Sequence, residues 1–149
     1  MNDWTIRDST DSDVDALRDV FRRASLSNPG DRPLLVGHPE HLVWSPAPSL
    51  ATRVAVVDGS IAGFASTTGP VAGVAELEDL FVAPESMRSG VGRALIADAG
   101  ARVRTLGARA IEVTGNEHAL AFYEAVGFVR IGTAPTAGGN APRLRLALD

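Results

Sequence analysis

The segment from Met87 to Leu95, MRSGVGRAL, has the residue types and spacing of an anion-binding loop. Gly90 and Gly92 flank Val91, and from Val91 onward apolar residues return at the spacing of a helix. A helix start leaves backbone N–H groups unpaired and carries the positive end of the helix dipole. Glycines there let a ligand approach the backbone, so the segment favours a phosphate. The alternative is a tight turn that needs glycine only for its backbone conformation.

Four carboxylates stand within stretches that otherwise have the apolar composition of strands. Glu76, Glu78 and Asp79 occur in the first stretch, and Glu112 occurs in the next one along the chain. Regular alternation predicts that Glu76 and Glu78 share one face of their strand and that Asp79 faces the other way. A buried carboxylate is unfavourable unless it is paired or used in chemistry. All four are therefore candidate functional groups, with a water-exposed sheet edge as the alternative for Glu76.

The remaining composition excludes several classes of site. The sequence has no cysteine, so it forms no disulfide, no thiolate zinc site and no thiol nucleophile. His38 and His41 lie in a stretch rich in proline and glycine and His118 lies at an expected helix start, so we expect no metal site. A net charge of −4 argues weakly against nucleic acid or an anionic membrane as a partner. No apolar run approaches the roughly 20 residues of a membrane span, and the charged start is not a signal peptide, so we expect a cytoplasmic protein.

These side chains must be positioned by alternating strands and helices in one domain, residues 1–149. We expect strands at Trp4–Arg7, Arg53–Val57, Ile61–Thr67, Val74–Val82, Ala110–Val113, Phe128–Gly132 and Leu144–Leu148. We expect helices over residues 14–26, 91–106 and 116–126. Asp58-Gly59 predicts a hairpin turn. The stretch 27–52 is irregular apart from one helical turn near His41–Trp44, and the chain before Leu144 is loose. The order predicts a mixed α/β sheet.

Two motifs identify a resemblance. The first is the glycine loop, which matches the pattern Arg/Gln-x-x-Gly-x-Gly/Ala except that Met87 takes the place of Arg or Gln. The second, N-x-x-A-x-x-F-Y-x-x-x-G-F, is complete from Asn116 to Phe128. With both, the sequence resembles the GNAT superfamily of acetyl-CoA-dependent N-acetyltransferases over most of its length. The resemblance implies a mixed, mostly antiparallel central sheet flanked by helices, and acetyl-CoA as the co-substrate.

The resemblance also implies how the coenzyme is held. The pantetheine arm should pair, like an added strand, with the backbone of Leu80, Phe81 and Val82. The pyrophosphate should lie on the loop, with Arg88 as the candidate replacement for the missing Arg or Gln. Asn116 could cap the following helix, contact the coenzyme, or do both. The residues expected to hold the phosphates are Arg88, Ser89, Gly90, Val91, Gly92 and Arg93.

A dinucleotide-binding fold is the competing interpretation of the glycine loop. Glu112 lies near the position of the acidic residue that follows a GxGxxG motif by about 20 residues. Against this interpretation, Leu95 occupies the place of the third glycine, and the strand order lacks a second βαβ half.

The catalytic residues that the resemblance implies are Tyr123 and one carboxylate. Tyr123 has a hydroxyl that is protonated at neutral pH, so it is expected to protonate the departing thiolate; packing beside the sheet is the alternative. Glu78 is the preferred base because it lies closest to the expected thioester position, with Glu76 and Glu112 as alternatives. Asp79 would orient the acceptor amine or pair with an arginine. Without a cysteine to carry an acyl group, direct attack by the amine in a ternary complex is the simplest mechanism.

The acceptor is expected to be a primary amine of a small molecule or peptide, bound by the segments 27–48 and 134–143. Trp44 in the first segment would stack on the acceptor or hold a cation, or else pack in the core beneath the segment. Arg143 in the second would hold an acceptor carboxylate or pair with Asp79. Substrate-binding candidates are thus Glu76, Asp79, Trp44 and Arg143. A non-catalytic acyl-CoA-binding module is the alternative function, and the oligomeric state, a homodimer among the options, stays open.

Overall fold

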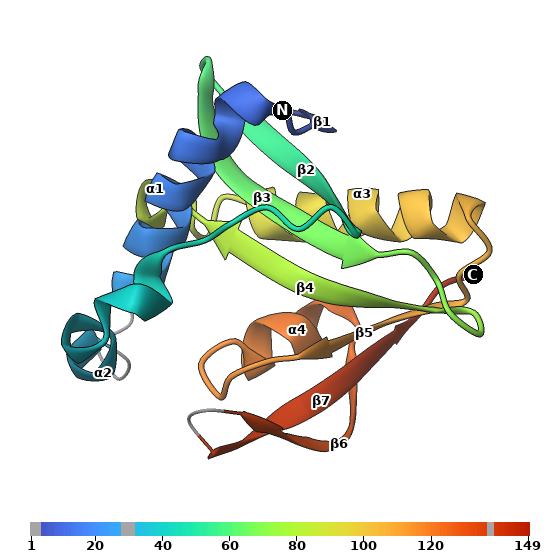
Figure 1. Cartoon of the computed structure of the whole chain (residues 1–149). Helices are drawn as coiled ribbons and strands as arrows, with labels where there is room; N and C mark the ends of the chain where they lie inside the picture. The colour runs from blue at the N-terminus through green and yellow to red at the C-terminus, as the bar shows by residue number, and fades with distance from the viewer. Residues whose placement is uncertain (1–3, 28–31, 137–138) are drawn as a thin grey trace.

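A computed structural model of the chain describes residues 4–27, 32–136 and 139–149 (Figure 1). The strands are β1 (Trp4–Asp8), β2 (Leu50–Val57), β3 (Ser60–Thr68), β4 (Val74–Val82), β5 (Ala110–Thr114), β6 (Val129–Thr136) and β7 (Gly139–Ala147). The helices are α1 (Val14–Leu26), α2 (Arg32–Gly37), α3 (Val91–Thr105) and α4 (Leu120–Val126). Short 3₁₀ turns occupy Asp11–Asp13, Pro39–Leu42 and Pro84–Ser86. No helix of the described ranges is long and apolar enough to cross a membrane.

The strands form one seven-stranded sheet in the order β1-β2-β3-β4-β5-β7-β6. Every neighbouring pair is antiparallel except β4 and β5, which run parallel. This parallel pair is short, because it joins only Val74–Glu76 to Ala110–Glu112. Beyond that point β4 continues to Val82 and β5 continues to Thr114, but the two strands no longer pair with each other. Figure 1 shows them spreading apart. The mixed, mostly antiparallel sheet predicted from the sequence is confirmed.

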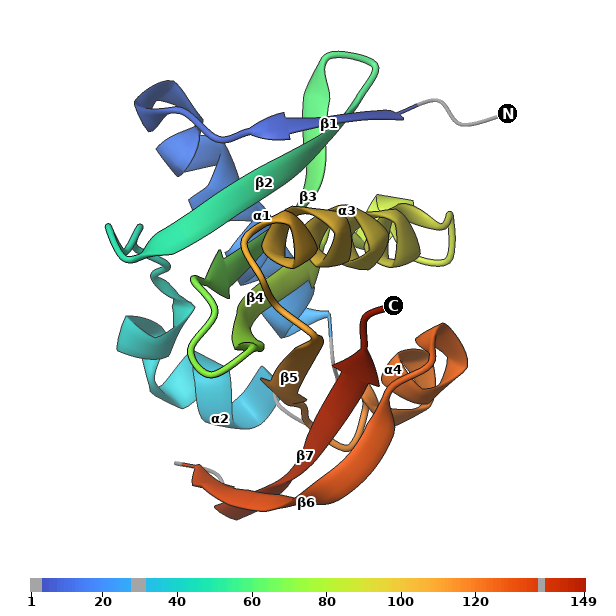
Figure 2. The ribbon, with the colours of Figure 1, turned by 90° about the vertical axis from the view of Figure 1, so that its right-hand side faces the viewer.

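Helices α1 and α3 cover opposite faces of the sheet, as Figures 1 and 2 show. Leu17 and Val20 of α1 pack against Phe64 of β3, within a cluster that also includes Trp44. On the opposite face of the sheet, α3 packs its apolar side chains against Ala65 of β3 and Leu77 of β4. The α3 side chains buried in this second cluster are Val91, Leu95, Ile96, Ala99 and Val103. The spacing of these residues is the helical periodicity that the sequence shows.

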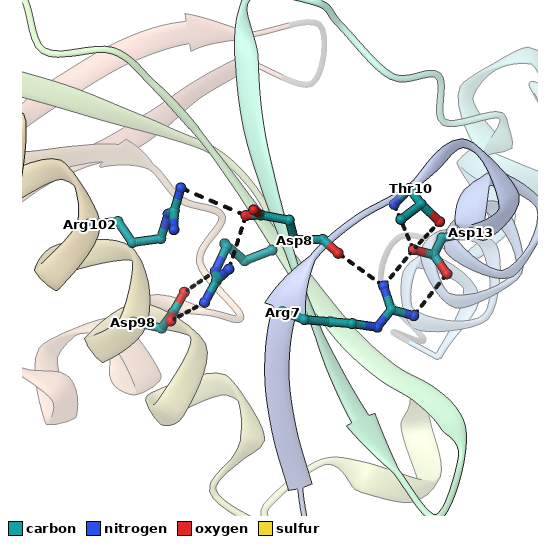
Figure 3. A network of polar contacts seen from close by, with 7 residues as sticks. Arg7, Asp8, Thr10, Asp13, Asp98 and Arg102 are labelled. Atoms are coloured by element: carbon teal, nitrogen blue, oxygen red, sulfur yellow. Dashed lines mark hydrogen bonds and ion pairs between the residues drawn. The ribbon is translucent and has the colours of Figure 1, made fainter.

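An ion-pair network fixes α3 to the edge of the sheet (Figure 3). Arg53 of β2 donates through Nε and Nη2 to the two carboxylate oxygens of Asp98 on α3, at 2.9 and 3.0 Å. Its Nη1 donates to Asp8 of β1 at 2.9 Å, and Arg102 of α3 lies 3.7 Å from the same carboxylate. Arg53 and Asp98 are mostly buried, with 17% and 18% of their side chains exposed. The network therefore joins α3 to β1 and β2.

A second polar cluster in Figure 3 organises the start of α1. The Asp13 carboxylate accepts hydrogen bonds from Arg7 at 2.8 and 3.0 Å and from the backbone N–H of Thr10 at 2.7 Å. The hydrogen bond from Arg7 contributes most to lowering the pKa of Asp13, which falls to about 2. The aspartate therefore stays charged and satisfies the backbone N–H of Thr10 in the turn that leads into the helix.

Two irregular segments of the sequence are more regular in the structure. Residues 32–37 form α2, which was not predicted, and the single turn expected near Trp44 lies slightly earlier, at Pro39–Leu42. The expected loose connection before Leu144 is wrong, because β6 and β7 pair from Val129–Arg145 to Thr136–Gly139. Most side chains of β6 are exposed, so its residues show no apolar alternation. Residues 28–31 and 137–138, which belong to the expected acceptor segments, lie outside the described residues.

Candidate active site

The start of α3 presents a row of backbone N–H groups that are available to a ligand. The loop turns sharply before the helix: φ is 65° at Arg88 and 95° at Gly90, the residue that precedes α3. Ser86 accepts a hydrogen bond from the N–H of Ser89, at 3.4 Å. Within the described ranges, no acceptor is found for the N–H groups of Arg88, Gly90, Val91, Gly92 and Arg93. Five N–H groups without an acceptor at a helix N-terminus favour an anionic ligand.

The second motif lies beside this loop. A Cβ atom added to Gly92 would be 3.1 Å from Cζ of Phe122 on α4, so the two helix starts approach closely only because residue 92 is glycine. Asn116 follows β5, and its Oδ1 accepts the backbone N–H of Ala119 at 2.9 Å. Asn116 therefore caps the turn that leads into α4. The two motifs, far apart in the sequence, meet where β4 and β5 separate.

The edge of β4 that faces β5 is open over its last residues. Leu80, Phe81 and Val82 pair with Ala65, Phe64 and Gly63 of β3 on one side only, because the pairing with β5 ends at Glu76. An extended chain could add to this edge through backbone hydrogen bonds, as peptides do at open sheet edges.

A β-bulge changes the faces on which the β4 carboxylates lie. Asp79 pairs with Ser66 of β3, and Leu77 pairs with Thr67, so Glu78 between them has no partner in β3. Leu77 packs in the α3 cluster, which places Glu76 on the opposite face, the same face as Asp79. The regular alternation predicted for this strand is therefore wrong. The sequence ELED carries no signal for the extra residue.

Arg143 of β7 gathers two of the carboxylates into one network. Its guanidinium pairs with both carboxylate oxygens of Glu76, with Nη2 at 3.0 Å from Oε1. Nη2 also donates to Glu112 at 2.8 Å, and Nη1 donates to the hydroxyl of Thr114 at 3.0 Å. Glu112 has a second partner, Arg145, at 3.1 Å. Both terminal nitrogens of Arg143 are thus engaged, and the alternative in which it pairs with Asp79 is wrong.

Glu78 differs from the other two base candidates. Its side chain is exposed, and no hydrogen bond or ion pair joins it to any other described residue. Partial burial raises the pKa of Glu78, the charges of Glu76 and Asp79 raise it further, and Arg143 acts in the opposite direction. Of Glu76, Glu78 and Glu112, only Glu78 is left without a partner to hold its charge.

Trp44 is a core residue. The ring is 7% exposed and lies 5.1 Å from the ring of Phe64, centroid to centroid, so it offers no free face to an acceptor. Of the two roles considered from the sequence, packing is the one observed. Its Nε1 donates to Asp79 at 3.0 Å, which fixes that carboxylate beside Glu78. Trp44 therefore acts on the site through Asp79.

Tyr123 is buried on α4 between two aromatic rings. Its ring centroid is 5.5 Å from that of Phe122 and 5.2 Å from that of Phe128, and only 7% of the residue is exposed. Burial raises the pKa of Tyr123 to about 12, which keeps its hydroxyl protonated. No described residue bonds this hydroxyl, and no buried side-chain nitrogen or oxygen of the described ranges lacks a partner. The hydroxyl therefore keeps some contact with solvent, although the side chain as a whole is packed in the core.

In the part of the chain that the structure describes, no group of three or more histidine, aspartate or glutamate side chains could hold a metal ion.

Comparisons with known proteins agree with this arrangement. The sequence profile described as the Acetyltransferase (GNAT) family matches residues 14–128. A protein of Desulfovibrio desulfuricans assigned to the GNAT family as an acetyltransferase is 25% identical, with a TM-score of 0.75 over 98% of this chain and 99% of that one. A ribosomal-protein alanine N-acetyltransferase from Escherichia coli is 23% identical, with a TM-score of 0.72 over 98% and 94%. The PaiA N-acetyltransferase from Thermoplasma acidophilum, solved with coenzyme A, is 16% identical, with a TM-score of 0.74 over 99% of each chain.

The family match and the fold support an acyltransferase that takes its acyl group from an acyl-CoA. The chain belongs to the GNAT acetyltransferase family. The resemblance predicted from the two motifs is confirmed, and the dinucleotide-binding alternative is wrong.

Proposed function

We propose that the protein transfers the acetyl group of acetyl-CoA to a primary amine of a small molecule or peptide. The observation that supports this most is the separation of β4 from β5 beside the unpaired N–H groups at the start of α3. A phosphate-binding loop at one end of a gap between strands suits a long ligand with an anionic head and a reactive thioester tail.

The coenzyme would bind along this gap. Charge-assisted hydrogen bonds of about 1.5–3 kcal/mol each from the loop amides would hold the pyrophosphate, with Arg88 and Arg93 at the rim. Both side chains are exposed there. The pantetheine arm would pair with the open edge of β4 at Leu80, Phe81 and Val82.

The chemistry would begin with proton removal from the acceptor. An alkylamine with a pKa near 10 arrives protonated, and Glu78, acting through a water molecule, would accept one proton. The free amine then attacks the thioester carbonyl directly, and the C–N bond forms. The C–S bond breaks as the tetrahedral intermediate collapses, and Tyr123 gives its proton to the sulfur. The second proton lost by the amine nitrogen restores Tyr123, so the products are the amide, free CoA and one proton.

The surroundings of Glu78 favour an acceptor without a carboxylate near its amine. Both terminal nitrogens of Arg143 already donate to Glu76, Glu112 or Thr114. The guanidinium therefore has no pair of terminal N–H donors left for an acceptor carboxylate. Glu78 and Asp79 add negative charge on the same strand. A cationic acceptor is attracted by this charge, and an anionic one is repelled.

A turnover assay tests the proposal against the non-catalytic alternative. Acetyl-CoA and a panel of amines (polyamines, aminoglycosides, amino acids and peptide N-termini) are incubated with the protein, and free CoA is measured. Amine-dependent CoA release that is absent in Tyr123→Phe supports the transferase. Binding of CoA by calorimetry, with no turnover for any amine, would instead support an acyl-CoA-binding module.

A further inference from the structure

Arg143 connects three strands at a single point. It projects from β7, pairs with Glu76 on β4, and donates to Glu112 and Thr114 on β5. The side chains of this group are mostly buried: 22% of Arg143, 28% of Glu76 and 17% of Glu112 are exposed. In such surroundings a bidentate guanidinium–carboxylate pair is stronger and more directional than one in open water.

This point is also where the sheet divides. Glu76 and Glu112 face each other in the last registered pair of β4 and β5, and beyond them the strands separate. Two like charges opposite each other on neighbouring strands repel. The guanidinium lies between them and offsets that repulsion. Without it, Glu76 would have no ion-pair partner among the described residues, and Glu112 would keep only Arg145.

The arrangement assigns different tasks to carboxylates that look equivalent in the sequence. We propose that Arg143 is a positioning residue: it holds Glu76 and Glu112, fixes where β4 and β5 part, and leaves Glu78 as the available base. Only the role of Glu78 as a base rests on the proposed function. The coupling between Arg143, Glu76 and Glu78 is a property of the folded protein that can be measured without turnover.

The charges that act on Glu78 come from two elements. On β4, Glu76 and Asp79 disfavour its ionised form, and on β7 Arg143 favours it. The residues of β3 that flank the bulge, Ser66 and Thr67, are neutral. Arg145 donates to Oε2 of Glu112, whereas Arg143 donates to Oε1. The pair of Arg143 and Glu76 therefore acts on Glu78 with opposing signs, and removing either member unbalances the other.

Direct titration of the Glu78 carboxyl carbon by NMR tests the proposal in the full-length protein, with Glu78→Gln to assign the signal. Arg143→Met should raise the pKa of Glu78 by about 1 unit, because it removes the favourable charge and leaves Glu76 unpaired. Glu76→Gln should lower it, because Arg143 is then less neutralised. The double variant should return the pKa toward that of the wild type. A residue that only stabilised the fold would not give opposite shifts that cancel.

Two matched variants complete the test. Arg145→Met, on the same strand and bonded to the same Glu112, should leave the Glu78 titration within about 0.2 units, since Arg145 is not among the charges that shift the pKa of Glu78. Arg143→Lys keeps the charge but loses the fork, so the pKa should stay near that of the wild type while the melting temperature falls. If Arg143→Met does not fold, Glu76→Gln alone decides, and an unchanged titration overturns the proposal.

Measurements of activity in the same variants separate this inference from the proposed function. With an accepted amine, the acid limb of kcat/KM should move in the same direction as the Glu78 pKa in each variant. If no amine is acetylated, the proposed function fails, and the NMR shifts still judge the coupling. Equal shifts for Arg143→Met and Arg145→Met, or shifts of the same sign for Arg143→Met and Glu76→Gln, would contradict the inference.

Discussion

At the scale of single residues, the site depends on which polar groups are engaged and which remain unpaired. Glu76 and Glu112 are engaged by arginines and Asp79 is engaged by Trp44, whereas Glu78 has no partner among the described residues. Tyr123 shows the same division within one side chain: the ring packs in the core, and the hydroxyl has no hydrogen-bond partner among the described residues. The site therefore has two candidate proton-transfer groups: Tyr123, which can donate a proton, and Glu78, which can accept one.

The sequence draws attention to these residues but does not indicate their partners. The motif from Asn116 to Phe128 locates Tyr123, and the apolar surroundings of Glu78 draw attention to it. The bulge at Glu78 depends on how β4 pairs with β3, which no local pattern encodes. The partners of Arg143 lie 67 and 31 residues away in the chain, so the alternatives of an acceptor carboxylate and Asp79 could not be excluded in advance.

The role of Tyr123 is tested by removing one oxygen atom. Because a general acid contributes about 10²- to 10⁴-fold, Tyr123→Phe should lower kcat by that range. The ring packs in the core, so the melting temperature should change little. Calorimetry should give unchanged CoA affinity, since the hydroxyl contributes only to the transition state. A variant that keeps wild-type kcat would show that the ring is there for packing alone.

The role of Glu78 is tested by pH dependence. A base works only when deprotonated, so kcat/KM should fall as pH drops through the Glu78 pKa. Since that pKa is raised above its usual 4.5, the acid limb should lie above the range of an exposed glutamate. Glu78→Gln should remove the limb, and Glu112→Gln should retain it because Glu112 is engaged by Arg143 and Arg145. The opposite result for these two variants would assign the base to Glu112.

At the scale of elements, the start of α3 and the entry to α1 carry the local interactions that matter most. Elements with a strong apolar period or a glycine signal, such as α1, α3 and the β2–β3 hairpin, match their sequence predictions closely. Elements whose side chains are largely exposed, such as α2 and the outer half of β6, do not. An element shows a regular spacing of apolar residues in its sequence only when one of its faces is buried.

Coenzyme binding at the start of α3 is tested by Gly92→Glu. The new side chain places a carboxylate and added bulk at the loop amides, beside the ring of Phe122. CoA affinity measured by calorimetry should fall at least about 100-fold, roughly 2.7 kcal/mol. Ala97→Glu on the exposed side of the same helix is the matched control and should bind CoA as the wild type does. Trp4 lies against Gly90, so its fluorescence gives a second measure of binding.

The entry to α1 is tested through stability. Asp13→Asn keeps an acceptor for Thr10 but loses the charge that holds Arg7, which should lower the free energy of unfolding by about 1 kcal/mol at pH 7. The folded-state pKa of Asp13 is depressed from 3.8 to about 2, so its contribution is complete above pH 4. The difference between wild type and variant should therefore shrink as pH falls from about 4 to about 2. Asp11→Asn, an exposed neighbour, should change stability by less than about 0.5 kcal/mol.

At the scale of the whole molecule, the proposed function depends on a sheet in which β4 and β5 pair only at one end and separate beyond Glu76 and Glu112. The ion pairs of Arg53 hold α3 to β1 and β2 on one side of the gap. The Arg143 network joins β4, β5 and β7 at its closed end. The order of strands and helices predicts such a mixed sheet, but not where the parallel pair would end. That position depends on a contact between distant strands, so it becomes visible only in three dimensions.

The charge of the molecule then determines which amines it should prefer. The net charge is −4, Glu78 and Asp79 lie beside the gap, and the guanidinium of Arg143 is already engaged by Glu76 and Glu112. Two unit charges about 4 Å apart interact by about 1 kcal/mol in water and more near a protein surface. A diamine should therefore exceed an α-amino acid of similar length in kcat/KM by at least about fivefold. The ratio should shrink as ionic strength rises from about 0.01 to 1 M, where the Debye length falls from about 30 to 3 Å. A preference for the amino acid at low salt, or a ratio that ignores salt, would show that the acceptor is read by shape or by residues other than these carboxylates.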